Sequence, residues 1–438
     1  MKKITKAVAA LLAAATSVSL AACGSSSSSS VDENAPVEIT WWGWGNTAET
    51  QAKDFMKKYP NITVKFANIG SADKQYISLN NAISANSGMP DVAMIEYHAL
   101  PQFVATGKLA DLTQFGADKY KDDYAAGPWA SVALNGGVYG LPVDSGPMAF
   151  FYNKEVFDKA GVDATQIKTW DDYYEAAKKI RAVGSYITSD SGDAGFYDSM
   201  TWLAGGHPFD SSEDGKTVTI NLTGDEGAQK FNEFWQKMID EDLIDTKTAG
   251  WSDDWNTGLG DGSIASLLTG AWMPVNLENG AAAASGKWRV TQMPTPDGQP
   301  ANSENGGSSL TVLDTGDKAK MAAAWKLVDY LNHSEEGTDK AYELGVFPSL
   351  KRILDSDEFV NYKSDYFGGQ EINKEFAKAS ENVISGWKFL PFEVQARKTY
   401  LDTVGKAFTG QATIEKGVAE WQDNLTTFAK DQGFEVKE

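Results

Sequence analysis

Aromatic residues that follow predicted strands are the side chains of this sequence best suited to contact a ligand. The chain holds 14 Trp, 16 Tyr and 20 Phe. An aromatic face carries negative quadrupole density, which suits the polarised C–H groups of a ring-shaped ligand. Carboxylate, amide and guanidinium groups add directional hydrogen bonds, the charged ones being stronger. The composition therefore offers both flat apolar contacts and directional hydrogen bonds to a ligand.

The candidate residues share a position just after a strand pattern, in a chain crossover or in a glycine-containing or polar segment. They are Trp44, Asn46, Glu96, Tyr97, Asp144, Trp202, Trp255, Trp272, Gly306 and Trp387. Ligands of open α/β sheets bind beyond the carboxyl ends of the strands, which is why these positions are selected.

Several candidates have an equally plain structural role. Asp144 could cap a turn, Trp202 could be a core residue of a helix, and Gly306 could belong to a simple turn. Trp251 and Trp255 are four residues apart and share a helical face, so we expect one in the core and assign Trp255 to the ligand. Arg397 could bind hydroxyls, but we expect a surface helix charge.

An enzyme is the first alternative function, and the sequence gives it little support. Glycosidases use a pair of carboxylates, yet adjacent acids such as Asp253 and Asp254 are expected by chance among 60 acidic residues, and no pair lies in a glycosidase motif. No glycine-rich nucleotide motif occurs. A glycoside hydrolase and a glycan-binding surface protein outside transport stay open as alternative functions.

Metal and cofactor binding are not predicted. Three His and one Cys leave little for a transition-metal site. The loop that starts at Asp190 resembles a calcium loop, but Thr201 stands where the bidentate Glu is needed. We therefore expect no cofactor and no metal.

The amino terminus is typical of an exported lipoprotein. Residues 1–22 carry three Lys, then an Ala-rich apolar stretch, then small residues before Cys23, as in a bacterial lipobox. Cys23, the only cysteine, is the expected lipidation site; the alternative is a free cysteine beside an ordinary cleavage site. Residues 23–36 are a Ser-rich tether. We expect the protein to be lipid-anchored at the outer face of the cell membrane.

Charge excludes some partners. The formal net charge is -21, and removing the three Lys of residues 1–22 makes it -24. So acidic a chain is not expected to bind nucleic acid.

Alternating strand and helix patterns predict an α/β fold. Strand patterns at 37–42, 62–66 and 91–95 alternate with helix patterns at 47–59, 72–86 and 98–105. This order indicates a parallel sheet covered by helices. Further on we expect a helix or turn at 261–270, a strand at 271–275 and a nearly all-helical segment at 371–434.

Several segments resemble the extracellular solute-binding proteins of bacterial ABC importers, in the sugar-binding group related to the maltose-binding protein. The segments, in chain order, are ITWWGWG (39–45), FMKKYPNITVKF (55–66), YGLPVDSGPMAFFYNKEVFDKAG (139–161), GSIASLLTGAWM (262–273) and AAAWKLVDYLNHSEEGTDKAYELGVFPSLK (322–351). Each is weak alone, but their order spans residues 37–430. The Ser-rich tether suggests a Gram-positive source.

The resemblance implies two lobes that close on a sugar, without catalysis. It implies an N-terminal lobe of residues 37–145 plus 305–350, and a C-terminal lobe of 146–304 plus 351–438. The chain would cross near 142–146, 296–304 and 349–353. The implied partners are a neutral oligosaccharide and the permease subunits of an ABC transporter, with the binding protein itself a monomer.

Overall fold

The computed structural model describes residues 35–437 except 46, 71, 213 and 214. The predicted signal peptide, Cys23 and all but the last two tether residues lie outside the described residues, as does Asn46. No helix within the described part is long and apolar enough to cross a membrane.

The first lobe is built on a five-stranded sheet of order β2-β1-β3-β14-β6. Its strands are β1 (Val37–Gly43), β2 (Ile62–Asn68), β3 (Val92–Glu96), β14 (Ser308–Val312) and β6 (Leu141–Pro142). β1 pairs in parallel with β2 and β3, whereas β14 runs antiparallel to β3 and β6. The predicted parallel sheet is therefore wrong in part: the sheet is mixed, because β14 returns from the second lobe in the opposite direction.

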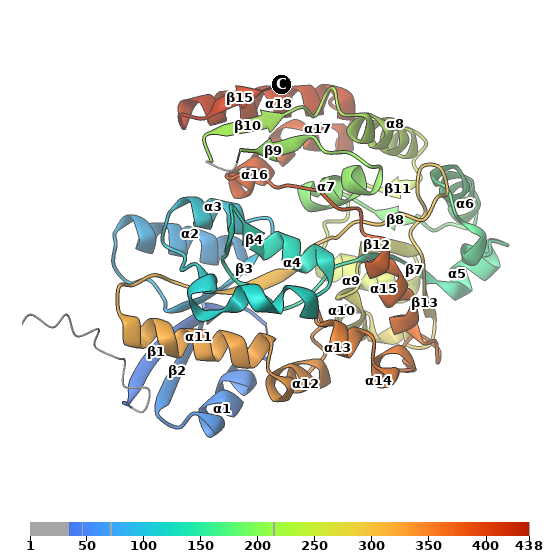
Figure 1. Cartoon of the computed structure of the whole chain (residues 1–438). Helices are drawn as coiled ribbons and strands as arrows, with labels where there is room; N and C mark the ends of the chain where they lie inside the picture. Colours follow the sequence, from blue (N-terminus) through green and yellow to red (C-terminus); the bar gives the residue numbers. More distant parts are fainter. Residues whose placement is uncertain (1–34, 46, 71, 213–214, 438) are drawn as a thin grey trace, which may run out of the picture.

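Helices cover this sheet, and the segments that form it are far apart in the sequence. The helices and short strands are α1 (Ala48–Lys58), α2 (Ala72–Ser84), α3 (Leu100–Ala105), α4 (Ala126–Val132), β4 (Ala133–Leu134), β5 (Gly137–Val138), α11 (Lys318–Asn332) and α12 (Glu335–Glu343). Figure 1 shows α11 beside β1 and β2 although more than 200 residues separate them. The predicted strand–helix order from residue 37 to 105 is confirmed.

The second lobe is built around β7 (Met148–Asn153). β7 lies between β12 (Ser266–Gly270) and β13 (Trp288–Thr291), antiparallel to both. All six residues of β7 are buried, and alternate side chains enter different cores, Phe150 one and Phe151 the other. Smaller sheets join β8 (Thr188–Ser189) to β11 (Ile244–Asp245), and β10 (Thr217–Ile220) to β9 (Phe209–Ser211) and β15 (Glu435–Lys437).

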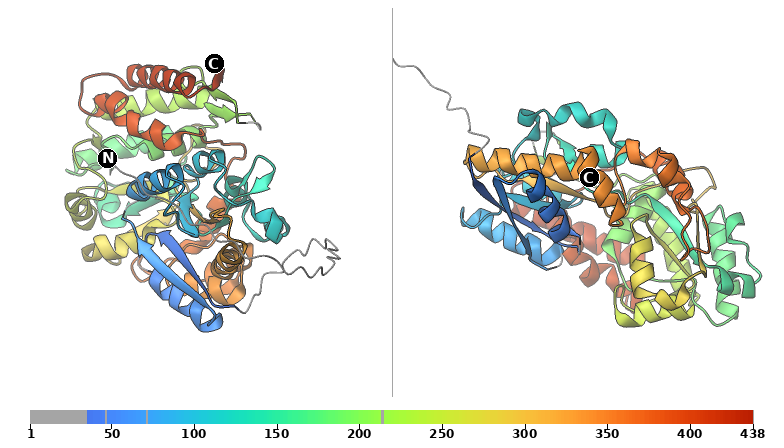
Figure 2. Two further views of the ribbon diagram at one scale, coloured as in Figure 1. Left: turned by 90° about the vertical axis from the view of Figure 1, so that its left-hand side faces the viewer. Right: turned by 90° about the horizontal axis from the view of Figure 1, so that it is seen from below.

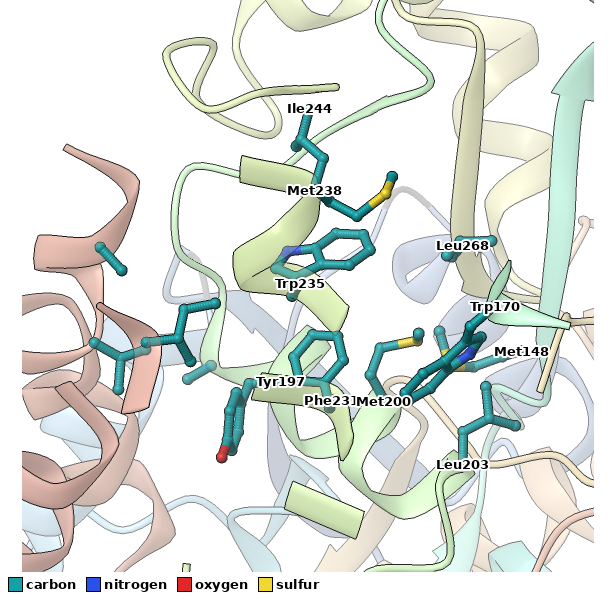
Figure 3. Close-up of a cluster of buried hydrophobic side chains, with 14 of the residues drawn as sticks. Met148, Trp170, Tyr197, Met200, Leu203, Phe231, Trp235, Met238, Ile244 and Leu268 are labelled. Carbon is teal, nitrogen blue, oxygen red and sulfur yellow. The ribbon is translucent and has the colours of Figure 1, made fainter. Parts of the chain in front are cut away.

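Helices from two distant parts of the chain complete this lobe. They are α5 (Lys154–Lys159), α6 (Trp170–Ala182), α7 (Ala194–Leu203), α8 (Glu226–Asp240), α9 (Asp253–Asp261), α10 (Met273–Gly280), α13 (Lys351–Leu354), α14 (Asp357–Val360), α15 (Ile372–Glu381), α16 (Glu393–Thr403), α17 (Gly405–Phe408) and α18 (Ile414–Asp431). Figure 2 shows the carboxy-terminal helices lying against the green α7–α8 region. Trp235 and Phe231 of α8 pack with Tyr197 and Met200 of α7 in the large core drawn in Figure 3.

One stretch of the second lobe was predicted wrongly. The strand is Ser266–Gly270, where a helix or turn was expected, and residues 273–280 are helix α10, where we expected a strand. The physical reason is visible in the sequence: an apolar run bounded by Gly262 and Gly270 forms a buried strand. Pro274 then fits the first turn of a helix, where its missing N–H costs nothing.

The chain segments that cross between the lobes lie next to each other. Residues 142–147 and 302–307 are hydrogen-bonded to each other, Asn305 N–H donating to the Gly146 carbonyl at 2.8 Å. A third connection passes Leu350, which bridges Tyr124. The Asp144 carboxylate accepts hydrogen bonds from the Ser308 N–H at 2.7 Å and hydroxyl at 2.6 Å, and so ties two crossovers together.

Candidate ligand-binding cleft

A cavity of about 790 Å³ lies between the two lobes. Glu96, the last residue of β3, and His98, two residues further on, line it from the first lobe. The second lobe supplies most of the wall, namely residues 188–196, 249–251, 255, 267–269, 273, 397, 400 and 401. The volume falls within the ~300–1,000 Å³ usual for small-molecule sites. A smaller cavity of about 380 Å³ lies beside the start of β1 and is lined by the first lobe and residues 35–36, so it is not shared by both lobes.

Three tryptophans form an aromatic cluster at one side of the cavity. The Trp251 ring lies 5.7 Å from Trp272 in a stacked arrangement and 5.2 Å from Trp255. Trp255 is 6% exposed and its Nε1 donates to Ser189 Oγ at 3.0 Å. Trp255 is therefore the buried member of the cluster and packs against the exposed Trp251. Trp251 is 58% exposed and lines the cavity. A flat apolar surface therefore faces the ligand space.

Trp251 also has an unusual backbone. Its φ is +66°, in the left-handed region that few non-glycine residues adopt. A bulky residue in this conformation costs about 1–2 kcal/mol. Strained residues cluster at functional sites, so the backbone of Trp251 supports the assignment of this cavity as a ligand site.

The polar floor of the cavity is formed by the loop before α7. Asp190 is 9% exposed; one carboxylate oxygen accepts from the N–H groups of Gly192 and Asp193, and the other accepts from Trp235 Nε1 at 2.8 Å. Burial raises the pKa of Asp190 to about 7. With this many internal partners, Asp190 fixes the loop shape. Asp193 then caps α7 by accepting from the Gly195 and Phe196 N–H groups.

Arg397 of α16 is the cation at this floor. Its Nη2 donates to Asp198 at 2.8 Å, and its Nε lies 3.4 Å from a Glu393 oxygen. The Asp198 and Glu393 side chains are 3% and 0% exposed, whereas that of Arg397 is 24% exposed. Burial raises the pKa of both carboxyls, against the opposing effect of the guanidinium. Two buried acids thus hold one partly exposed arginine.

The described residues of the first-lobe wall are polar or small and include no cation at neutral pH. The Tyr76 hydroxyl donates to a Glu96 carboxylate oxygen at 2.9 Å. His98 Nδ1 lies 3.9 Å from the same oxygen. Burial, with Arg397 nearby, lowers the pKa of His98 well below its usual value. His98 is therefore neutral, and it reaches the second lobe at Phe389, 6.4 Å between ring centroids.

The structure divides the predicted site residues into groups. Glu96 and Trp255 line the cavity, and Trp272 stacks on its exposed tryptophan. Trp202 and Trp387 stack at 5.4 Å beside a narrow crevice that shares His98 and Arg397 with the cavity.

The other predicted residues are placed differently. Gly306 lies against Trp272 and also lines the crevice. Tyr97 is 2% exposed and its hydroxyl donates to the Asp144 carbonyl at 2.7 Å, so both residues lie at the crossovers and do not line the cavity. Trp44 packs on Tyr76 at 6.3 Å and is likewise not part of the cavity wall.

Three features of the cavity were missed by sequence reasoning. Arg397 was expected to be a surface charge, Trp251 was expected to be the core member of its pair, and the loop from Asp190 to Gly195 was treated as a simple polar loop. Gly250 before Trp251 was a usable signal, since glycine often marks a change of chain direction. Glu393, four residues before Arg397, was a local signal only for an ordinary helix ion pair. The hydrogen-bonded partner Asp198 is 199 residues away, so the sequence did not reveal that Arg397 lies at the cavity.

The fold and the cavity define a class: a two-lobed α/β protein with its ligand site between the lobes. The chain belongs to the bacterial extracellular solute-binding protein family, whose pattern matches residues 50–365. This family and its relatives are solute-binding proteins and not enzymes.

The relatives include sugar-binding proteins. The arabinooligosaccharide-binding protein of Bacillus subtilis (strain 168) is 28% identical over 418 residues, covering 87% of this chain and 93% of that protein. The lactose-binding protein of Rhizobium radiobacter is 28% identical over 363 residues, covering 78% of this chain and 81% of that protein.

A solved structure is more similar. It is the ABC transporter associated binding protein of B. animalis subsp. lactis Bl-04 in complex with β-1,6-galactobiose, at 55% identity and a TM-score of 0.84, covering 92% of this chain and all of that one. The galacto-N-biose/lacto-N-biose I-binding protein of Bifidobacterium longum, in complex with lacto-N-biose, is 26% identical with a TM-score of 0.77, covering 92% of this chain and 99% of that one. The predicted family and fold class are confirmed.

Proposed function

We propose that this protein captures a short, neutral, galactose-containing oligosaccharide of the β-1,6-galactobiose type and delivers it to the permease of an ABC importer. The observation that carries the proposal is the interlobe cavity, with an exposed tryptophan at one side and a polar floor at the other. The 55% identity to a β-1,6-galactobiose complex supports this choice of ligand.

A neutral ligand follows from the charges around the cavity. Glu96, Asp190 and Asp193 line it, and the carboxylates of Asp198 and Glu393 already pair with Arg397. An anionic sugar would bring another negative charge into an acidic, partly buried space, which is unfavourable. Hydroxyl groups, in contrast, can both donate to carboxylates and accept from the guanidinium.

Binding and lobe closure are linked in this proposal. A sugar in the cavity touches both lobes, so it favours the closed arrangement by its differential affinity. The crossovers at 142–147, 302–307 and 349–351 are the proposed hinge. The proposed lobes are residues 37–145 plus 305–350, and 146–304 plus 351–438.

The candidates in the cleft keep their proposed roles: Trp272 and Trp255 as parts of the aromatic cluster, and Glu96 as a hydroxyl ligand. We also propose that Trp202, Trp387 and Gly306 shape the inner end of the site. Roles in ligand contact for Trp44, Asn46, Tyr97 and Asp144 are proposed only for a ligand-bound arrangement.

We further propose that the mature protein is a monomer anchored by a lipid on Cys23. Two signals support the anchor: the lipobox-like residues before Cys23 and the Ser-rich tether after it. Cys23→Ser should release the protein into the medium, and size-exclusion chromatography with light scattering of the released protein should give the monomer mass.

The test is calorimetric titration and thermal unfolding of residues 24–438 with a sugar panel. The panel holds β-1,6-galactobiose, lactose, lacto-N-biose, arabino-oligosaccharides, maltose and an acidic disaccharide. A ligand at about 100 Kd adds ~2.7 kcal/mol, which raises the melting temperature by several degrees. Recovery of the sugar intact supports capture. Consumption of the sugar would indicate a hydrolase, and absence of binding to every sugar would refute the proposal.

A further inference from the structure

The guanidinium of Arg397 is held on one side and open on the other. Nη2 donates to Asp198, and Nε pairs with Glu393, both carboxylates being buried. Among the described residues, Nη1 donates no hydrogen bond, although Arg397 lines the cavity. In the described chain, Arg397 Nε, Glu393 Oε1 and one Asp198 carboxylate oxygen are also buried without a hydrogen-bond partner. The contact with Glu393 is therefore an ion pair without a hydrogen bond. The arginine is thus fixed in place with donors to spare.

Access to Nη1 from the cavity depends on Gly195. A Cβ atom on Gly195 would lie 3.2 Å from Nη1 and 3.3 Å from the Asp193 carboxylate, which is closer than such atoms normally come. Gly195 is the second residue of α7 and lies outside the left-handed region, so its backbone does not require glycine. Glycine is a poor helix former. The presence of glycine at position 195 is therefore better explained by the space needed in front of the Arg397 guanidinium than by a backbone conformation that only glycine adopts.

We propose that Arg397 determines sugar specificity from the second lobe, by donating from Nη1 through the gap at Gly195 to adjacent hydroxyl oxygens of one sugar ring. Gly195 is the positioning residue that keeps the gap open. The inference rests on the proposed function, because it names how the same cleft recognises its sugar.

The chemistry of the group suits this task. A guanidinium is planar and presents its N–H groups in a fixed fork, so one nitrogen reaches two neighbouring acceptors. The two buried carboxylates fix the fork before the sugar arrives, and such preorganisation reduces the entropy lost on binding. They also offset its charge, so a neutral diol is accepted without an anionic sugar being favoured.

Gly195→Ala is the decisive variant, with Gly260→Ala as its matched control. Gly260 lies in helix α9 and does not line the cavity, and a Cβ there would meet only Ala281 Cα at 4.0 Å, an ordinary van der Waals contact. Alanine is the better helix former at both sites, while crowding of the Asp193 cap at position 195 acts in the opposite direction. We therefore expect both variants to fold with melting temperatures close to that of the unmodified chain.

The measurement is the Kd for β-1,6-galactobiose by titration calorimetry on residues 24–438. Loss of one hydrogen bond to a charged group weakens binding by about 10- to 150-fold. We expect a loss of that order in Gly195→Ala and in Arg397→Lys, and less than a twofold change in Gly260→Ala. Equal affinity in Gly195→Ala and the unmodified chain would overturn the role of the gap.

A series of monodeoxy β-1,6-galactobioses separates recognition from a general structural effect. The analogue that lacks the contacted hydroxyl should bind the unmodified chain weakly and lose little more in Gly195→Ala, since coupled changes are not additive. If every analogue loses the same further factor in Gly195→Ala, the direct contact is refuted. If the unmodified chain binds no panel sugar, the proposed function fails and this inference fails with it; if the chain binds and the variants do too, only this inference fails.

Discussion

Replacement of Trp251 by alanine should weaken sugar binding while leaving the fold intact. The ring is 58% exposed, so more than half of its surface makes no contact with the protein. What it does contact is Trp255 and Trp272, which have other partners: Trp255 Nε1 bonds Ser189, and Trp272 Nε1 bonds the Asn305 carbonyl at 2.6 Å. The exposed face is therefore the part whose loss matters for the ligand.

The magnitude follows from the exposed area. A tryptophan presents up to about 250 Å², so 58% exposure leaves roughly 145 Å² of Trp251 uncovered. If a sugar covers half of this, about 70 Å² is buried, worth ~1.8 kcal/mol at ~25 cal/mol per Å². That corresponds to an affinity loss of about 20-fold. Trp251→Tyr keeps a ring and should lose only a few-fold.

The assay is titration calorimetry with β-1,6-galactobiose, paired with thermal unfolding. Tyr362→Ala is the matched control, because Tyr362 is 49% exposed and does not line the cavity. A drop of many degrees in the melting temperature of Trp251→Ala would show that the ring is structural. An unchanged Kd in a stable Trp251→Ala variant would refute the platform role.

The remaining predictions concern buried groups near the crossovers. Burial raises the pKa of Glu304 to about 7, above its unfolded value, so its contribution to stability is lost as the pH rises from about 4.5 to 7. Glu304→Gln should therefore raise the unfolding free energy by up to ~3 kcal/mol at pH 8, with no gain near pH 4.5. Denaturant unfolding at both pH values measures this difference. An equal gain at both pH values would contradict the raised pKa of Glu304. Gly146→Ala should lower the melting temperature by several degrees, because its Cβ would overlap the Asn305 carbonyl; an unchanged temperature would mean that the crossover can shift. Asn302→Ala removes the side-chain donor to the buried Met148 carbonyl and one of the two donors to the Ala379 carbonyl, which keeps the Asn382 N–H. It should cost about 1–3 kcal/mol, readable as a lower denaturant midpoint, with exposed Asn279→Ala as the control.

Strand and helix order was predictable because it depends on local periodicity. The alternation in Val37–Gly43 places Ile39, Trp41 and Gly43 on the buried side, as the structure has it. The direction of β14 was not predictable in this way. Its pairing with β3 joins residues more than 200 positions apart, and only the return of the chain from the second lobe sets it antiparallel.

The cleft was harder to predict than the fold. Helical periodicity shows which residues share a face of a helix, but it does not show which other element packs against that face. Trp251 and Trp255 were recognised as a pair, but which of them would be exposed depends on the backbone at residue 251, whose φ of +66° turns its ring outward from the helix that begins at 253. Arg397 looked like an ordinary helix charge. Its partners come from α7 and from one turn earlier in α16, and their burial is set by the docking of α16 onto the second lobe.

Because α16 docks onto the second lobe, that lobe contributes more of the cleft wall than the first lobe does. The aromatic cluster, the loop before α7 and Arg397 all belong to the second lobe, whereas Glu96 and His98 face them from the first. The second-lobe groups are fixed by buried bonds of their own, such as Asp190 to Trp235 and Arg397 to Asp198. A surface that is ordered without its ligand loses little entropy when the ligand arrives. The second lobe is therefore built to hold the sugar, and the neutral His98 on the first lobe can approach Arg397 and Phe389 without bringing a second positive charge into the closed cleft.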